Sequence, residues 1–462
     1  MRRRNNRRGK SKGKIVGILL FLLVAAAAAY VYTAPNFERV KPQIEGPDNM
    51  VWNRKDPLKI KITDNQALKD FEIVLSDGKN SIIVGKDTFS DKPKEKILSI
   101  KYPKSKTIDK NAKELKLEVT AHDSSFWNLL QGNSVKKIFN ISVDSKRPNV
   151  NILSNSYSIT QGGSALVVFQ AYDENMDSLY VQVGKKKFKA QPYKKEGYYA
   201  ALIAWPFQQK GFSAKVIAID QAKNKRVANV PLYIKSRKYK VSWIRAKDKF
   251  IDGKITDLAS SDPEYSDIEE RLEKLKIINE TMREKNEEVI HALGEKVSDE
   301  MFNEWKIKKF YPLKNSAIVA KFGDERHYYY KNKSNEVSAS YHVGYDMAST
   351  KMADIKTSNP GTVVYANENG IYGNMPMIDH GLGLYTLYGH CSQLFVKEGD
   401  EIGTGEVIAK TGMTGLALGD HLHFGVLVQG VEVRPIEWLD QKWIEKNIDN
   451  VFKVANKIID GK

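Results

Sequence analysis

The residues best suited to chemistry lie in the last third of the chain, which holds six of its eight histidines. His342 and Asp346 stand four positions apart, and His421 and His423 stand two apart. Because residues i and i+2 of a strand face the same side, His421 and His423 are predicted to share one face while the residue between them faces a core. Imidazoles and a carboxylate are the ligand set of a catalytic zinc, which keeps a fourth position open for water. The pattern therefore indicates a zinc hydrolase.

Three segments of this region resemble motifs of the lysostaphin/LytM-like family of zinc peptidoglycan endopeptidases. That family carries H-x-G-x-D-x-A, then a histidine in a Y-x-H context, then H-L-H-F, and the matching residues here are 342–348, 388–390 and 421–424. Further family-like segments surround them: 322–326, 372–374, 378–381, 396–400 and 411–415. The resemblance covers roughly residues 311–440. An ordered set of this kind is far more specific than a lone H-x-H.

The resemblance implies a role for each matching residue. His342, Asp346 and His423 correspond to the ligands of one Zn²⁺ per chain. His390 and His421 correspond to the pair that orients the attacking water and stabilises the oxyanion. A zinc in such a site acidifies the water and polarises the scissile carbonyl, and a nearby imidazole can move a proton or hold developing charge. The resemblance further implies an antiparallel β-sheet peptidase domain that acts on peptidoglycan.

Four other residues of this region are expected to serve structure. His380, in Asp-His-Gly, is typical of a hairpin turn. Cys391, the chain's one cysteine, is expected to be a small buried hydrophobe. Pro376 cannot donate to a ladder, which predicts an edge strand or a bulge at that point. For His327, packing and a place in the substrate groove both stay open.

The N-terminus predicts the compartment. Residues 2–14 hold eight Arg or Lys and no acid, and residues 15–37 hold no charge. Ile15–Tyr32 is almost wholly apolar, near the lower limit of about 17–25 residues for a spanning helix. Since basic flanks stay in the cytoplasm, we expect a cytoplasmic tail (1–14), one anchor in the inner membrane (15–33) and a catalytic domain in the periplasm or cell envelope. A cleaved signal peptide is the alternative, because Ala25–Ala29 offers small residues to a peptidase.

The composition narrows the class of protein and the partners that it can have. The net charge is +17, of which eight charges belong to the tail, and the remaining excess fits either a solvated surface or an anionic partner such as wall polymer. Nothing resembles a nucleic-acid module, so no nucleic-acid partner is predicted. One cysteine allows no intrachain disulfide, and 41% hydrophobic with 28% charged residues is typical of globular domains.

Between anchor and peptidase the chain is rich in alternating apolar residues and looks duplicated. Each half has stretches in which apolar and polar residues alternate and which end at an acidic residue. Asp64 of the first half corresponds in this pattern to Asp173 of the second half, and Asp123 to Asp220. This pattern predicts two immunoglobulin-like β-sandwiches. The acids at the strand ends could bind a cation, although forming turns is their commoner role.

The predicted layout is mostly β. The two sandwiches are expected at 40–145 and 146–236, a helical linker at 237–300, the peptidase domain at 301–445 and a C-terminal tail at 446–462. Asp262-Pro263-Glu264 predicts a helix start in the linker, with Ser261 and Glu264 at capping-box spacing.

An apolar stripe follows in the linker, from Ile268 to Leu293. It is expected to pack against a neighbouring domain, with a short coiled coil as the alternative. The linker could also cover the active-site groove.

The sequence leaves two main functional classes open. The first is a zinc endopeptidase that cuts stem or cross-link peptides of peptidoglycan in wall remodelling. The second is a LytM-like regulator that activates another wall hydrolase and binds its protein partner through the stem or the linker. Degenerate members of that kind lack zinc ligands, whereas the full set here favours catalysis. An enzyme that cuts secreted proteins is a third, compatible possibility. Among wall bonds, we expect D-Ala-to-diamino-acid cross-links ahead of glycine bridges.

Overall fold

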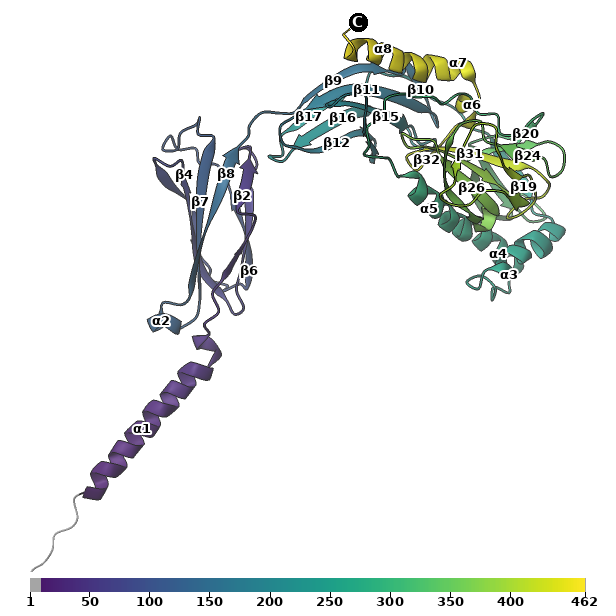
Figure 1. The fold of residues 1–462 in the computed structure, drawn as a ribbon. Helices are drawn as coiled ribbons and strands as arrows, with labels where there is room; N and C mark the ends of the chain where they lie inside the picture. Colours follow the sequence, from purple (N-terminus) through teal and green to yellow (C-terminus); the bar gives the residue numbers. More distant parts are fainter. Residues whose placement is uncertain (1–9, 462) are drawn as a thin grey trace, which may run out of the picture. The chain divides into compact units, whose positions relative to one another are not determined.

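The computed structural model describes residues 10–461, so residues 1–9 of the predicted basic tail lie outside the described chain. Most of the regular structure is β-strand, which confirms the predicted fold class (Figure 1). By contacts, the chain divides into two compact units. The first runs to residue 146 and includes 221–224, and the second comprises 147–220 and 225 onward.

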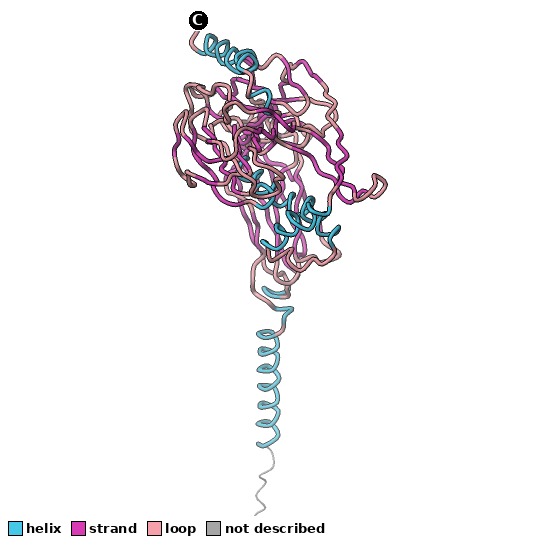
Figure 2. Tube along the Cα trace, turned by 90° about the vertical axis from the view of Figure 1, so that its right-hand side faces the viewer, coloured by secondary structure: helices cyan, strands magenta, loops and turns pink. Residues whose placement is uncertain are grey.

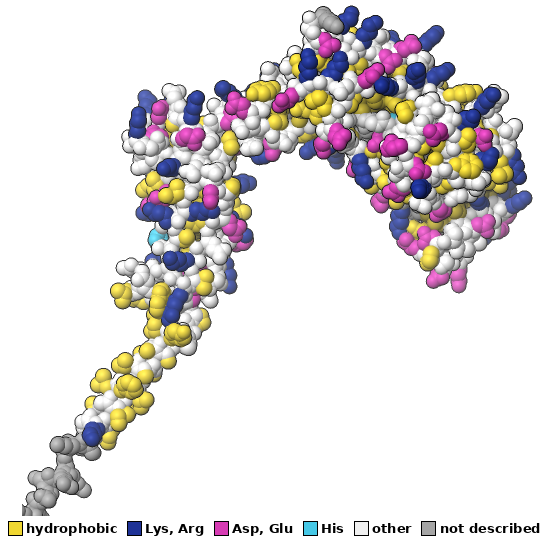
Figure 3. Space-filling model, in the orientation of Figure 1, with side chains coloured by type: hydrophobic (Ala, Val, Ile, Leu, Met, Phe, Trp, Pro, Cys, Tyr) yellow, Lys and Arg dark blue, Asp and Glu magenta, His cyan; other side chains and the backbone are white. Residues whose placement is uncertain are grey.

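Helix α1 (Lys10–Thr33) opens the described chain, and Figure 2 shows it as one uninterrupted helix. Its segment Gly13–Thr33 has 21 residues, a mean hydropathy of 2.5 and no buried part. Hydrophobic side chains cover the face of α1 visible in Figure 3. At about 1.5 Å per residue this segment matches a hydrocarbon core of about 30 Å. The predicted apolar N-terminal helix is confirmed; a membrane anchor and a signal sequence both fit its length and composition.

Two sheets form the rest of the first unit, in the orders β2-β8-β7-β4-β5 and β1-β3-β6. Their strands are β1 (Gln43–Glu45), β2 (Asn49–Trp52), β3 (Leu58–Thr63), β4 (Leu68–Ser76), β5 (Ser81–Thr88), β6 (Glu95–Ile100), β7 (Glu114–Asp123) and β8 (Ser134–Val143). Alternate residues of β3 and β7 are buried, as expected for sheets with one core-facing side. Both sheets contribute to one core that includes Trp52, Ile60 and Phe139, and we call this pair of sheets the first sandwich. Short helical turns η1 (Pro35–Phe37) and α2 (Trp127–Leu130) flank it.

The second unit begins with two four-stranded sheets, β14-β15-β11-β9 and β13-β12-β16-β17, and a parallel pair, β10-β18. Their strands are β9 (Asn149–Asn155), β10 (Ser158–Thr160), β11 (Ser164–Tyr172), β12 (Met176–Val183), β13 (Lys186–Lys189), β14 (Gln191–Pro192), β15 (Tyr198–Ala204), β16 (Ala214–Asp220), β17 (Lys225–Asn229) and β18 (Tyr233–Lys235). We call the two four-stranded sheets the second sandwich. Every residue from Ser164 to Phe169 is buried, because the second sandwich is covered on more than one side.

An eight-stranded sheet follows, in the order β20-β23-β31-β27-β26-β25-β29 with β32 beside β31. Smaller sheets, β19-β21-β22 and β24-β30-β28, complete this region. We call the eight-stranded sheet the main sheet and the three sheets together the main sheet region. The strands are β19 (Val241–Arg245), β20 (Ala317–Ala320), β21 (Asp324–Tyr329), β22 (Glu336–His342), β23 (Tyr345–Ala348), β24 (Asp354–Lys356), β25 (Gly361–Glu368), β26 (Asn374–Asp379), β27 (Leu384–Gly389), β28 (Gln393–Leu394), β29 (Glu401–Ile402), β30 (Val407–Lys410), β31 (Leu422–Val428) and β32 (Val431–Val433).

Strand β26 bears on the two alternatives expected at Pro376, an edge strand or a bulge. It lies between β25 and β27, so Pro376 is not on an edge strand. Pro376 pairs with Ala366 of β25, while pairing with β27 begins only at Met377, so the missing N–H costs no bond to that neighbour. The ladder with β25 is irregular between Val363 and Tyr365, which places a bulge nearby.

The linker forms helices that cover one face of the main sheet. They are η2 (Phe250–Ile255), α3 (Thr256–Ser261), α4 (Arg271–Ile277), η3 (Ile278–Met282) and α5 (Arg283–Gly294). Leu275, Met282 and Ile290 share a core with Met377 and Leu427 of the sheet, which confirms intramolecular packing of the apolar stripe.

The predicted helix start at Asp262 is wrong. Helix α3 ends at Ser261, and turns lead from there toward α4, where Glu270 accepts a cap hydrogen bond from the N–H of Glu273. Asp262 instead accepts from the backbone N–H of Glu264, so its carboxylate stabilises a turn.

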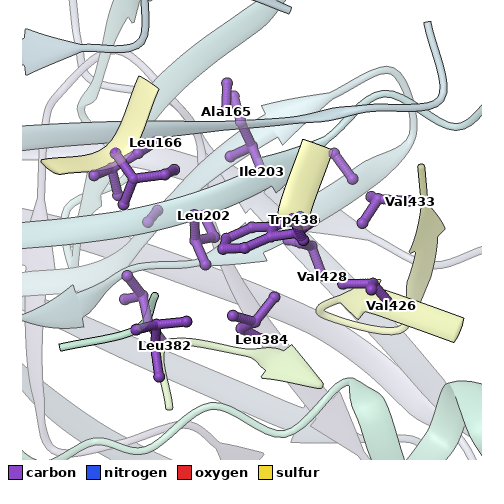
Figure 4. Packing of buried hydrophobic residues seen from close by; sticks show 14 of the residues in the cluster. Ala165, Leu166, Leu202, Ile203, Leu382, Leu384, Val426, Val428, Val433 and Trp438 are labelled. Carbon is purple, nitrogen blue, oxygen red and sulfur yellow. The ribbon is translucent and has the colours of Figure 1, made fainter. Parts of the chain in front are cut away.

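The second sandwich and the main sheet share one hydrophobic core, whereas a separate spacer module would have its own core. Figure 4 shows Trp438, from α6 (Pro435–Trp438), among Leu202 and Ile203 of β15 and Val426 and Val428 of β31.

The chain after α6 also packs on the second sandwich. Helices α7 (Gln441–Ile444), η5 (Glu445–Asp449) and α8 (Asn450–Ile459) follow, and α8 contacts β9 and β11. The segment predicted as a tail therefore contributes buried Phe452 and Ala455.

Buried polar contacts accompany this shared core. Gln429 exchanges two hydrogen bonds with the backbone of Lys189, of 2.7 and 3.0 Å. The Glu437 carboxylate accepts from the backbone N–H of Ser164 at 3.0 Å and pairs with Arg434 at 3.1 Å. Burial raises the pKa of Glu437 to about 7, against partial compensation by Arg434 and Ser164. The folded chain therefore binds a proton at Glu437 more tightly than the unfolded chain does.

This carboxyl group should make stability depend on pH. The ordinary pKa is 4.5, so the stabilising contribution of protonated Glu437 is complete below about 4.5 and is lost as pH rises through about 7. We expect Glu437→Gln to match the wild type at pH 4.5 and to exceed it at pH 8 by up to about 3 kcal/mol. Thermal unfolding between pH 4.5 and 8 measures this, with exposed Glu445→Gln as the control. Parallel curves for wild type and Glu437→Gln would contradict the expectation.

Candidate metal centre

Three strands bring His342, Asp346 and His423 together. His342 is the last residue of β22, and Asp346 lies on β23 after a short connection. Strand β31 runs antiparallel to β23 with His423 directly opposite Asp346. The neighbouring Leu422 and Phe424 are fully buried, as predicted from the alternation. The pairing register therefore joins residues that are 77 positions apart in the chain.

The facing atoms of these three side chains form a tight triangle. Asp346 Oδ1 lies 2.8 Å from His342 Nε2 and 2.9 Å from His423 Nδ1. The two imidazole nitrogens are 3.1 Å apart. His342 and His423 are each 5% exposed, so little solvent shields the three groups from one another.

Hydrogen bonding fixes which atom of His342 faces the triangle. Its Nδ1 lies 3.0 Å from the carbonyl oxygen of Lys321, so Nδ1 carries the proton and donates. Neutral His342 then presents the lone pair of Nε2 to the Asp346 carboxylate. Two acceptors 2.8 Å apart repel unless a cation lies between them, either a proton or a metal ion. Two imidazole nitrogens and one carboxylate oxygen suit zinc, with a carbonyl behind one ligand to orient it.

Gly344 permits the close approach of β23 and β31. A Cβ at this position would lie 2.5 Å from His423 Nε2 and 2.9 Å from the backbone oxygen of Phe424. Both distances are shorter than side chains tolerate. The glycine of the H-x-G-x-D pattern is therefore required by the packing of the facing histidine.

His390 and His421 lie beside the triangle. Strand β27 pairs Gly389 with His423, so His390 follows at the strand end, where its φ is 67°. The rings of His390 and His421 are 4.8 Å apart, and His421 Nε2 is 3.6 Å from Asp346 Oδ1. Each donates Nδ1–H to a backbone carbonyl, His390 to Thr414 and His421 to Gly419. Both Nε2 atoms therefore stay free to act as base or, once protonated, as donor.

The site shifts several pKa values. Burial, followed by the charges of His423 and His421, holds the pKa of His390 well below its usual range. Burial also lowers the pKa of His423 to about 4. For His421 burial opposes the charged form, but the neighbouring Asp346 carboxylate raises its pKa overall. Burial would likewise raise the pKa of Asp346, yet the histidines around it, His342 foremost, hold it well below its usual range.

Two further side chains at the centre were absent from the predicted site. Tyr372, in η4 (Gly370–Tyr372), packs its ring 5.5 Å from that of His423. Arg326 of β21 places Nη2 3.6 Å from Asp346 Oδ2. Both belong to family-like segments, 322–326 and 372–374, so the sequence signal for them was present.

The residues expected to serve structure belong to the main sheet region, and one of them, Cys391, directly follows His390. His380 bonds the backbone of Leu384 across the β26–β27 turn, as expected for a hairpin. Burial raises the pKa of the Cys391 thiol to about 12, and this thiol donates to the carbonyl of Tyr388. His327 stacks on Trp243, with ring centroids 4.7 Å apart, which favours packing over a groove role.

A β-sheet domain that converges two histidines and an aspartate beside two further histidines defines a class of metal-dependent hydrolases. Residues 340–435 match the sequence model of Peptidase family M23. This part of the chain is therefore an M23 peptidase domain, as the resemblance to lysostaphin and LytM predicted.

Curated relatives match the same region. The chain is 38% identical over 95 residues to the DD-carboxypeptidase/endopeptidase Mpg of Neisseria meningitidis, which covers 21% of this chain and 22% of that protein. It is 35% identical over 100 residues to the murein hydrolase activator NlpD of Salmonella dublin, covering 21% and 26%. The chain thus spans about a fifth to a quarter of the length of these relatives. Enzymes and activators both occur among them.

Solved structures give a wider but weaker likeness. A putative peptidase M23 from Pseudomonas aeruginosa aligns with 61% of this chain and 94% of its own, with a TM-score of 0.36 and 18% identity.

Proposed function

We propose that this chain is a zinc-dependent endopeptidase that hydrolyses peptide bonds in the stem or cross-link peptides of peptidoglycan. One observation carries the proposal: the facing atoms of His342, Asp346 and His423 lie within 3.1 Å of one another, beside two histidines of fixed tautomer. Such an arrangement suits a metal-dependent hydrolase, and the M23 match supplies the substrate class. The names of the matched endopeptidases support D,D cross-links as the bond.

The five polar residues would have two kinds of role, metal ligation and proton transfer. His342, Asp346 and His423 would hold the zinc. A bound zinc would polarise the scissile carbonyl and acidify a water at its open position. His390 and His421 lie beside these three residues, and one of them would take the proton of the attacking water while the other would donate to the developing oxyanion. Because backbone carbonyls hold their Nδ1–H groups, the two rings need not reorient during the reaction.

The location follows from α1 and its basic flank. We propose a single-pass anchor in the inner membrane with the N-terminus in the cytoplasm, which places the peptidase in the periplasm or cell envelope. Peptidoglycan is then the partner within reach, and no nucleic acid is involved. Helices α3–α5 and the first sandwich offer surfaces for a regulatory protein.

An activator of another wall hydrolase is the second candidate, favoured by the 35% identity to NlpD. The complete set of His342, Asp346, His390, His421 and His423 argues against it. An activator needs a binding surface, whereas it does not need three converging lone pairs and two oriented imidazoles.

Digestion of purified muropeptides tests the function. Membranes carrying the full chain, with zinc present, are expected to convert cross-linked muropeptide dimers to monomers, resolved by mass. Shortened stems on intact dimers would indicate a carboxypeptidase instead, and no product from any wall type would favour the activator. The same preparation tests location, because a soluble active protein that lacks the first 30 or so residues would indicate a cleaved signal peptide.

A further inference from the structure

A second group of metal-ligating side chains lies in the first unit, outside the M23 domain. Glu38 precedes β1, Asp64 directly follows β3, and Asp123 ends β7 close to α2 (Figure 1). One carboxylate oxygen from each lies within 4.8 Å of the other two. Three segments far apart in the sequence therefore place their acids at one end of the first sandwich.

Turn formation accounts for only part of this cluster. Asp64 Oδ1 accepts from the N–H groups of Gln66 and Ala67, at 2.8 and 2.7 Å, which is the ordinary use of an aspartate after a strand. Asp64 Oδ2, in contrast, is buried without any hydrogen-bond partner, in a residue only 9% exposed. A buried carboxylate oxygen without a partner is costly, which makes Asp64 Oδ2 a candidate ligand for a cation.

The neighbours hold the other two acids rigidly. Asp123 is fully buried and accepts from the N–H groups of Ser125 and Asn133 and from the Asn133 side chain. Glu38 accepts from the N–H of its near neighbour Val40 at 2.7 Å. The backbone oxygen of Glu38 also accepts from Ser125 Oγ at 2.7 Å and from Asn133 Nδ2 at 3.1 Å. The cluster is therefore preformed.

The charge of the cluster is not balanced by side chains. Among the described residues, no lysine or arginine forms an ion pair with any of the three carboxylates. Like charges that share a buried site destabilise one another, and a bound cation removes this cost.

We infer that Glu38, Asp64 and Asp123 bind a calcium ion. Three carboxylates without a histidine or a cysteine favour a hard cation, because zinc sites usually include nitrogen or sulfur ligands beside any carboxylate. A spread of at most 4.8 Å equals about twice a Ca–O distance of about 2.4 Å, so one ion can reach all three. Calcium accepts six to eight ligands in irregular geometry, whereas magnesium demands a near-ideal octahedron that three separately held carboxylates do not readily provide.

The ion would fasten the segment after α1 to the first sandwich. Residues 36–40 already bond to the β7–β8 connection, since Phe126 N–H donates to the Asn36 carbonyl and Ser125 to that of Glu38. Calcium would add direct ligation between Glu38 and the ends of β3 and β7. The sequence repeat places Asp173 and Asp220 at the positions of Asp64 and Asp123, which suggests the same use of strand-end acids in the second sandwich.

Calcium binding by the full chain in detergent tests the inference. The protein is stripped of divalent ions, reloaded with zinc, and titrated with calcium chloride in equilibrium dialysis. Asp64→Asn is expected to bind one calcium ion fewer per chain than the wild type. Asparagine keeps the turn, because its amide oxygen can accept the same two N–H groups, but it removes one charge from the cluster. Equal binding by wild type and Asp64→Asn would overturn the inference.

The matched control is Asp77→Asn. Asp77 is a half-buried turn aspartate of the same unit that lies outside the cluster. Its Oδ1 accepts from the N–H groups of Lys79 and Asn80 and its Oδ2 from that of Asp109, so this variant should bind calcium like the wild type. Zinc content should be equal in all variants, which separates this site from the M23 centre. Magnesium chloride that competes at equal concentration would overturn the choice of calcium.

A second variant keeps the test decisive if Asp64→Asn fails to fold. Glu38→Gln changes a half-buried side chain and is expected to weaken calcium binding on the order of tenfold or more. Calcium should also raise the unfolding temperature of the wild type more than that of Glu38→Gln. Unchanged affinity in Glu38→Gln would contradict the proposed ligand set.

Discussion

In the variant His423→Ala, zinc is expected to be lost together with cleavage of muropeptides, whereas His421→Ala should keep its zinc and lose only turnover. The two residues are two positions apart but differ in their relation to the carboxylate. His423 Nδ1 lies 2.9 Å from Asp346 Oδ1 and 3.1 Å from His342 Nε2, inside the triangle. His421 Nε2 lies 3.6 Å from the same oxygen, beside the triangle. The first histidine therefore fits a ligand, and the second fits a proton carrier.

Elemental analysis and a muropeptide assay on the same samples measure both effects. The wild type and His421→Ala should hold about one zinc per chain, and His423→Ala close to none. Turnover by His421→Ala should fall about 10²–10⁴-fold, the usual contribution of a positioned acid or base. His122→Ala, in the first unit, serves as the control and should match the wild type in both. Zinc retained by His423→Ala and lost from His421→Ala would reverse the two assignments.

The sequence predicted that these side chains lie close together, because strand geometry translates directly into position. Two-residue periodicity places His421 and His423 toward Asp346, and the buried Leu422 between them confirms the alternation. The ordered motifs added His390, which no local periodicity connects to the others. Tyr372 and Arg326 were overlooked although they lie in recognised segments, because their contacts depend on how separate strands cross.

The architecture around the centre was harder to predict for the same reason. The continuous apolar runs of β11 and β15 indicate buried strands, but nothing in these runs states that Leu202 and Ile203 will pack against Trp438 and the main sheet. The linker shows a second limit of prediction from the sequence. Ser261 and Glu264 have the spacing of a capping box, yet the helix ends at Ser261, since tertiary packing and the turn at Asp262 override a local signal.

Gly344→Ala is expected to disrupt the metal centre without removing any ligand. The added Cβ would lie 2.5 Å from Nε2 and 2.6 Å from Cε1 of His423, and 2.9 Å from the backbone oxygen of Phe424. The backbone on both sides is fixed by the pairing of β23 with β31, so the imidazole has to move. A displacement of about 1 Å at a catalytic group costs on the order of 10²-fold in rate. Zinc affinity should fall as well, because His423 Nδ1 turns away from Asp346.

The fold should survive this change, since overpacking by one methyl group costs about 1–3 kcal/mol. Competition with a chelator gives zinc affinity, circular dichroism reports the fold, and muropeptide cleavage reports turnover. Gly253→Ala is the matched control, because a Cβ there meets nothing within 4 Å. If folded Gly344→Ala has the zinc affinity and turnover of the wild type, the His423 ring can move aside without loss of metal binding or activity. In that case the glycine of the H-x-G-x-D pattern would need another explanation than the space it leaves for the facing histidine.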